Sequence, residues 1–140
     1  MRVLALDVGE RRIGIALSDP TALLASPFTT VTSRGDDSDI EEVLRIATEN
    51  SAAEIVVGMP LLLSGRKGPQ AVRVTAFAEA LGHRTEIPIV FADERYSTVQ
   101  AERSLRESGV QPSRERARVD AAAAAVILQS YLDARRMETS

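Results

Sequence analysis

The amino-acid sequence predicts an α/β fold in which an antiparallel meander of three strands is followed by alternating helices and strands. In the N-terminal part, short apolar runs of alternating polarity are separated by turn signals, which is typical of a β-meander. From residue 38 onwards, segments with helical spacing of apolar residues alternate with β-branched runs, as in parallel strands connected by helices. The 140 residues, 44% of them hydrophobic, suit one domain over 1–140 with a sizeable core.

The first strand, expected at residues 4–8, ends on a carboxylate. Asp7 follows an apolar run and precedes a turn at Gly9. An ionised carboxylate loses hydration if it is buried, unless a cation or several donors face it. Asp7 therefore either faces a metal ion or caps the turn, and this stretch by itself leaves both interpretations open.

The next two strands complete the meander. Residues 12–18 alternate between Ile or Leu and small or polar residues, which indicates a strand with one apolar face that forms a hairpin with the first. Asp19 and Pro20 are turn formers, and residues 27–31 are rich in strand formers. This third strand should pair antiparallel with the second, and its Pro27 favours an edge position.

The first helix is expected to begin at Ser38, which forms a capping-box pattern with Glu41. Its core face follows helical spacing and comprises Ile40, Val43, Leu44 and Ala47. Three acids cluster at the helix start: Asp36, Asp37 and Asp39. We interpret them as acids favoured by the helix dipole rather than as metal ligands.

A fourth strand at residues 54–57 is β-branched, which favours a parallel interior position. The loop 61–68 that follows carries Arg66 and Lys67 between glycines, just before a helix that starts at Pro69. Such a loop suits an anion at a helix N-terminus, but it also occurs as a simple connector. The apolar residues expected on the core face of this helix are Val72, Ala76, Phe77, Ala80 and Leu81.

The C-terminal part carries three further candidate acids. A fifth strand at residues 88–91 leads to Asp93 and Glu94, and a helix follows up to Gly109. Ser97 and Thr98 are interpreted as cap residues of that helix rather than nucleophiles. A last, buried helix runs through the alanines at 121–125, with Asp120 near its start, where on its own it would be interpreted as a dipole-compensating acid.

The composition limits the chemistry. The chain has no Cys and a single His, His83, so thiolate zinc sites and histidine clusters are excluded and any metal must be held by oxygen. No stretch reaches the roughly 18 apolar residues of a membrane span, so we expect a soluble, cytoplasmic protein. The net charge of −3 argues against a basic nucleic-acid coat protein but allows local basic patches.

The order of strands and helices, with acids on strand one, after strand five and on the last helix, is that of an RNase H-like domain. The motifs resemble those of the YqgF/RuvX family, whose members are regarded as Holliday junction resolvases and pre-16S rRNA nucleases. They extend over nearly the whole chain and comprise residues 6–9, 12–16, 18–19, 57–61, 65–71, 93–95 with Thr98, and 119–120 with 123–131.

The resemblance implies a five-stranded mixed sheet with helices on both faces, in which the fourth and fifth strands run parallel to the first. It implies Asp7, the Asp93–Glu94 pair and Asp120 as ligands of magnesium (or manganese) in a phosphodiesterase, and Glu94 is favoured over Asp93 because it reaches further. Paired divalent ions about 3.5–4 Å apart would neutralise the attacking and leaving oxygens. The nucleic-acid-binding residues expected around these acids are Arg11, Arg12, Arg66, Lys67, Arg95, Arg114, Arg116 and Arg118.

The sequence departs from the family pattern before Asp120, where Arg116 or Arg118 replaces a common lysine, and at Ala121, which replaces a common polar residue. Our leading hypothesis is a metal-dependent endonuclease acting on branched DNA or a precursor rRNA end. The alternatives are a non-catalytic nucleic-acid-binding module and a relative of the actin-like kinases, although the latter need a second domain. DNA or RNA as substrate, and a homodimer, remain open.

Overall fold

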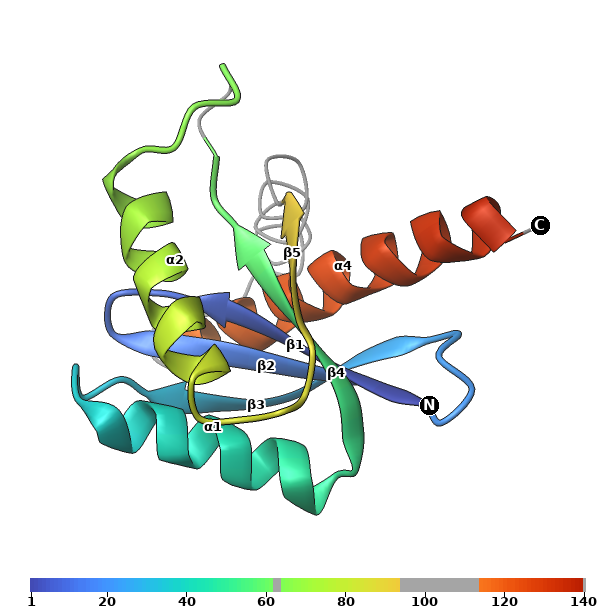
Figure 1. Ribbon diagram of the computed structural model, residues 1–140, viewed down its shortest axis with the longest axis horizontal. Helices are drawn as coiled ribbons and strands as arrows, with labels where there is room; N and C mark the ends of the chain where they lie inside the picture. The colour runs from blue at the N-terminus through green and yellow to red at the C-terminus, as the bar shows by residue number, and fades with distance from the viewer. Residues whose placement is uncertain (62–63, 94–113, 140) are drawn as a thin grey trace.

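The computed structural model describes residues 1–61, 64–93 and 114–139 (Figure 1). The predicted helix up to Gly109 lies outside these residues, as does Glu94. The elements are β1 (Arg2–Val8), β2 (Arg12–Ser18), β3 (Ala25–Thr32), α1 (Asp37–Glu49), β4 (Ala52–Met59), α2 (Pro69–Gly82), β5 (Ile89–Asp93) and α4 (Arg114–Thr139).

The five strands form one mixed sheet in the order β3-β2-β1-β4-β5. β1, β2 and β3 are an antiparallel meander, and β4 and β5 run parallel to β1, which confirms the predicted sheet. Because parallel strands end at the same end of a sheet, the last residues of β1, β4 and β5 lie at one end of the sheet.

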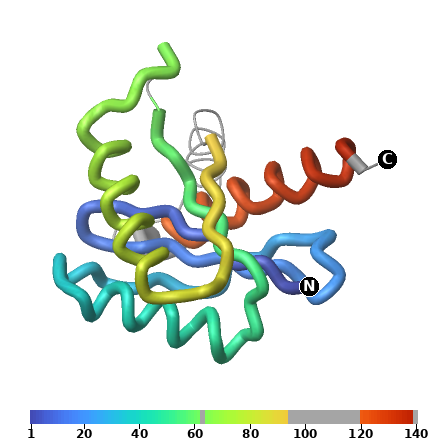
Figure 2. The backbone as a smooth tube through the Cα atoms, viewed as in Figure 1, coloured from blue at the N-terminus to red at the C-terminus, as the bar shows by residue number. Residues whose placement is uncertain are grey.

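Helices cover both faces of the sheet, as predicted (Figures 1 and 2). Leu4 and Leu6 of β1 belong to a core cluster with residues of α1 and α2, whereas Val3 and Ala5 belong to a second cluster with residues of α4. This division follows from the alternation of side chains along a strand. In β1, residues an even number of positions from Val3 therefore face α4, and residues an even number of positions from Leu4 face α1 and α2.

β3 is the edge strand on one side of the sheet, which confirms the prediction from Pro27. Its pairing with β2 shifts between Thr29, opposite Ile15, and Pro27, opposite Ala16, so that Phe28 is an extra, bulged residue. The Phe28 side chain is 49% exposed. A proline and a bulge both disfavour the addition of a further strand to an exposed edge.

The start of α1 differs from the prediction. The N-cap is Asp36, whose carboxylate accepts a hydrogen bond from the backbone N of Ser38 at 2.9 Å, so Ser38 lies inside the helix. Asp39 is only 4% exposed, and it accepts hydrogen bonds from the Ser33 hydroxyl and the backbone N of Arg34, both at 2.8 Å. Asp39 therefore fixes the loop before the helix, in addition to lying in its first turn.

The buried face of α2 is rotated relative to the prediction. Ala71, Val74, Ala78 and Leu81 are buried, whereas Val72 is 60% exposed. Leu81 was predicted on this face, and Phe77 and Ala80 also pack partly buried against the core, as predicted, so the prediction was wrong for Val72 and Ala76. The prediction favoured the larger Val72 over Ala71, whereas the helix lies close to the sheet, and close approach favours the small side chain.

The turn between β2 and β3 is organised by Asp19. Its carboxylate accepts hydrogen bonds from the backbone N of Leu23 and Leu24 at 2.8 Å, and from the Thr21 hydroxyl. The backbone N–H of Leu24, followed by the Thr21 hydroxyl, holds the pKa of Asp19 well below its usual range.

A carboxyl group with a lowered pKa in the folded state stabilises the fold above its unfolded pKa of about 3.9 and loses this contribution as the pH falls below it. We therefore expect Asp19→Asn to lower the free energy of unfolding at pH 6 and to have a smaller effect at pH 3. Urea unfolding of both proteins at the two pH values measures this. An equal loss at both would mean that the charge of Asp19 contributes nothing.

Within the described part of the chain, no helix is both long and apolar enough to cross a membrane.

Candidate functional site

Asp7 lies on the α4 side of the sheet. It shares this side with Val3 and Ala5 of the same strand, both of which pack in the α4 cluster. It is half-buried, and its cross-strand partner in β2 is Gly14. Because Gly14 has no side chain, the surface beside Asp7 is open to another element.

The element that lies over Gly14 is α4. A Cβ atom built on Gly14 would lie 2.0 Å from the backbone O and 2.3 Å from the backbone C of Asp120. No side chain fits at that distance, so α4 packs with its backbone directly on β2. This contact brings Asp120 over the residue opposite Asp7, and the structure therefore places these two predicted acids on the same face and at the same end of the sheet.

The position of Asp120 within α4 bears on whether this acid merely compensates the helix dipole. The helix begins at Arg114, so Asp120 is not in its first turn, contrary to the expectation that it lies near the helix start. The favourable effect of the helix dipole on an acid is confined to about the first turn. Dipole compensation therefore does not explain an acid at this position.

Asp120 forms an ion pair across the face of the sheet. The Nε of Arg12, the first residue of β2, donates to its Oδ2 at 2.8 Å, and both side chains are roughly 70% buried. Arg12 and Gly14 lie on the same side of β2, since they are two residues apart. β2 thus contributes Gly14, which makes room for the α4 backbone, and Arg12, which pairs with the Asp120 carboxylate.

Of the Asp93–Glu94 pair, the structure describes only Asp93. Asp93 ends β5 opposite Met59, and its neighbour Ala92 packs against the α4 cluster. Side chains alternate along a strand, so Asp93 is on the opposite side from Ala92, and hence from Asp7. Glu94, which the sequence favours as the ligand, lies outside the described residues.

Three of the basic residues predicted to bind nucleic acid lie in segments that follow β1 and β4, at this end of the sheet. Arg11 is exposed in the β1–β2 turn, and Arg66 and Lys67 are exposed in the loop before α2. An ion pair of 3.0 Å between Arg73 and Glu10 links α2 to the β1–β2 turn. Arg95 lies outside the described residues, and Arg114, Arg116 and Arg118 belong to the part of α4 that precedes Asp120.

The donor set suits a hard cation. The chain has no cysteine, and the single histidine, His83, is exposed at the C-terminal end of α2. Carboxylate oxygens are the ligands that magnesium prefers. Among the residues that the structure describes, no three acidic or histidine side chains come close enough to hold a metal.

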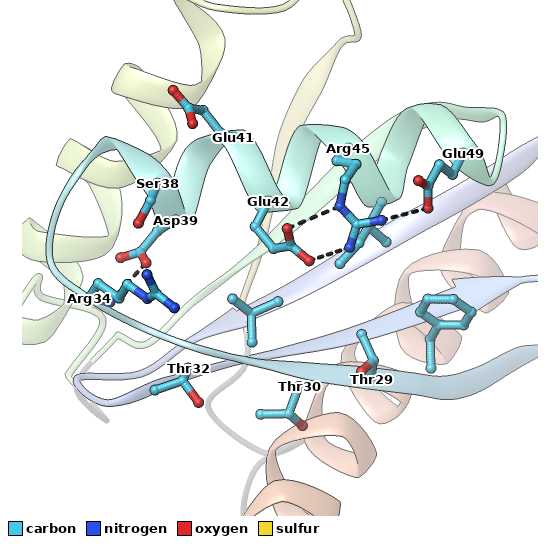
Figure 3. Close-up of a pocket in the computed structure, with 13 residues that line it drawn as sticks. Thr29, Thr30, Thr32, Arg34, Ser38, Asp39, Glu41, Glu42, Arg45 and Glu49 are labelled. Atoms are coloured by element: carbon cyan, nitrogen blue, oxygen red, sulfur yellow. Dashed lines mark hydrogen bonds and ion pairs between the residues drawn. The ribbon is translucent and has the colours of Figure 1, made fainter.

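A separate groove of about 890 Å³ lies between β3 and α1 (Figure 3). Three of its charged residues pair with one another: Arg45 forms ion pairs with Glu42 and Glu49 along α1. None of the acids predicted to be metal ligands and none of the basic residues predicted to bind nucleic acid lines it. The groove therefore carries no chemistry that competes with the pair formed by Asp7 and Asp120.

The chain is similar in sequence to known proteins over nearly its whole length. A family model described as "RuvX: Holliday junction resolvase" matches residues 1–134. A protein of Roseiflexus sp. (strain RS-1) named "Putative pre-16S rRNA nuclease" is 47% identical over 135 residues, which covers 96% of each chain. A protein of the same name from Chloroflexus aurantiacus is 45% identical, over 96% of this chain and 88% of its own.

Among solved structures, RuvC of T. thermophilus in complex with a Holliday junction superposes with a TM-score of 0.58. The match covers 97% of this chain and 96% of that one at 14% sequence identity. At that identity the similarity concerns the fold alone, and it supports the RNase H-like architecture expected from the order of elements.

Proposed function

Because the chain belongs to the RuvX family, we propose that it is a metal-dependent nuclease that hydrolyses phosphodiester bonds in structured nucleic acid. The observation that supports this most directly is the packing of Asp120 on Gly14, opposite Asp7. Two acids on one face and at one end of a sheet disfavour each other's ionised form, and a shared cation would relieve that repulsion.

We assign Asp7 and Asp120 as metal ligands, with Glu94 as the third. The sheet fixes the backbone of Asp7, and the contact of α4 with Gly14 fixes the backbone of Asp120, so the fold sets both positions before a cation binds. Magnesium or manganese bound there would activate the attacking water and stabilise the leaving oxygen. Asp93, on the other side of β5, serves in this proposal as a residue that shapes the strand end rather than as a ligand.

The basic residues bind the sugar–phosphate backbone in this proposal. Arg11, Arg66 and Lys67 are exposed, and the overall charge of the chain is negative, so these residues form a local basic region and not a general one. Arginine binds phosphate with two parallel hydrogen bonds, and such contacts position a nucleic acid without reading its sequence. They are thus compatible with a junction or an rRNA end.

The test is a cleavage assay of the full chain on a four-way DNA junction and on a precursor 16S rRNA fragment, each with Mg²⁺ and with chelator. We expect cleavage of at least one substrate that requires the metal. Binding of the same substrates, measured in chelator from low to high salt, should weaken steeply because phosphate contacts release counterions.

The two arms separate the leading function from its alternative. Salt-dependent binding with no cleavage at any metal concentration would make the protein a non-catalytic nucleic-acid-binding module. Cleavage that persists in chelator would contradict the metal site. The substrate that is cut faster identifies the natural class, whether branched DNA or precursor rRNA.

A further inference from the structure

We infer that Arg12 is an exchangeable counterion of the candidate site: it neutralises Asp120 when no metal is bound and passes to a substrate phosphate when a divalent cation takes its place. The inference rests on the proposed function and adds to it a link between metal binding and substrate binding. It concerns a side chain that sequence reasoning placed only among the phosphate-binding residues.

The contact geometry leaves most of the guanidinium available. Arg12 uses its Nε for Asp120 Oδ2, and within the described part of the chain this is the only hydrogen bond that its side chain makes. The two terminal nitrogens, which carry four of the five N–H donors, therefore have no protein partner there. A guanidinium held at one nitrogen can reach a phosphate with the other two after a modest rotation.

Charge gives the reason for the exchange. Asp7 and Asp120 bring two negative charges to one face, and Arg12 brings one positive charge into direct contact with the second. Both partners are largely buried, so the pair is screened less than a surface ion pair. A divalent cation on the same carboxylate would make Arg12 an unfavourable like-charged neighbour, and a nearby phosphate is the partner of matching charge and geometry.

This arrangement couples two ligands. In the metal-free protein a cation must compete with Arg12 for Asp120, and after it binds, the released guanidinium adds a contact to the nucleic acid. Each ligand therefore strengthens the binding of the other, as linkage requires.

The first measurement is Mn²⁺ affinity without nucleic acid, followed by electron paramagnetic resonance of the free ion, for the wild type, Arg12→Gln and Arg11→Gln. Arg11 is the matched control because it carries the same charge one residue away, is exposed, and makes no ion pair within the described residues. We expect Arg12→Gln to bind Mn²⁺ on the order of tenfold more tightly. Arg11→Gln should change the affinity by less than about twofold.

The second measurement is junction affinity in chelator and in Ca²⁺, with a gel to check that no cleavage occurs. The gain in affinity on adding Ca²⁺ should shrink on the order of tenfold in Arg12→Gln. Arg11→Gln should weaken binding in both conditions and keep the gain. Thermal melting of each variant verifies folding, and Arg12→Met, which retains an apolar stem, replaces Arg12→Gln if that variant melts early.

The outcomes distinguish a failure of the Arg12 exchange from a failure of the proposed metal-dependent function. Mn²⁺ binding by a folded Arg12 variant that is equal to or weaker than that of the wild type would show that Arg12 does not compete with the cation and would overturn the exchange. If the wild type itself binds no Mn²⁺, then the metal site fails, and the inference fails with it. Tighter Mn²⁺ binding together with a reduced Ca²⁺-dependent gain supports the exchange.

Discussion

Asp7→Asn is expected to reduce the rate of metal-dependent cleavage on the order of a thousandfold or more, because a neutral amide replaces the carboxylate that we propose as a metal ligand. Asn has the same shape, so β1 keeps its place between β2 and β4. Removal of one charge from a face that carries two acids should leave the metal-free protein as stable as the wild type or more so. Junction binding in chelator should persist, since the arginines are unchanged.

Cleavage and thermal melting are to be measured on the same preparation of Asp7→Asn. A variant that melts normally and cuts at the wild-type rate would make Asp7 a turn residue, which is the other interpretation of a carboxylate before Gly9. A variant that neither melts cooperatively nor cuts would show that Asp7 is required for folding. Only normal melting with lost cleavage agrees with a ligand role.

Gly14→Ala is expected to have the second-largest effect. The new Cβ would lie 2.0 Å from the backbone O of Asp120, and backbone cannot move aside as a flexible side chain can. α4 must shift away from β2, which should lower the free energy of unfolding by roughly 1–3 kcal/mol, as overpacking does. A displacement of about 1 Å at Asp120 should reduce cleavage on the order of a hundredfold.

Gly82→Ala is the matched control for this variant. It also adds a single methyl group to a glycine, but there the Cβ would meet only Ile89 Cδ1, at 3.6 Å, which is ordinary contact. We expect urea unfolding and cleavage of Gly82→Ala to be close to those of the wild type. Wild-type cleavage by Gly14→Ala would show that the α4 contact does not position Asp120.

Much of the sheet could be predicted from the sequence because its strands show strong local patterns. The alternation over residues 12–18 predicted both a strand and its small face, and Pro27 predicted the edge. Local patterns were weaker guides to helix ends and faces. Asp36 rather than Ser38 caps α1, and Ala71 rather than Val72 is buried in α2, because tertiary packing decides between neighbouring residues of similar propensity.

The sequence predicted that Asp7 and Asp120 come together, and the structure brings them to the same face and end of the sheet, but their contacts were not predicted. Asp7 and Asp120 were identified from their places at a strand end and in a helix, together with the family resemblance. The ion pair of Asp120 with Arg12 and the backbone contact at Gly14 join segments that no local pattern connects. One signal was present: a small face on residues 12–18 and an alanine-rich last helix are complementary surfaces, and close backbone packing follows from that match.

The distance along the chain between the partners of that contact has a kinetic consequence. Arg12 and Asp120 are 108 residues apart in sequence, so they meet only after a long loop has closed, and long-range contacts of this kind form slowly. The β-meander relies on near neighbours and can form early, with Asp7 already in place on its strand. A chain whose last helix has not yet docked thus holds one carboxylate without the other, and cutting activity would report that folding is complete.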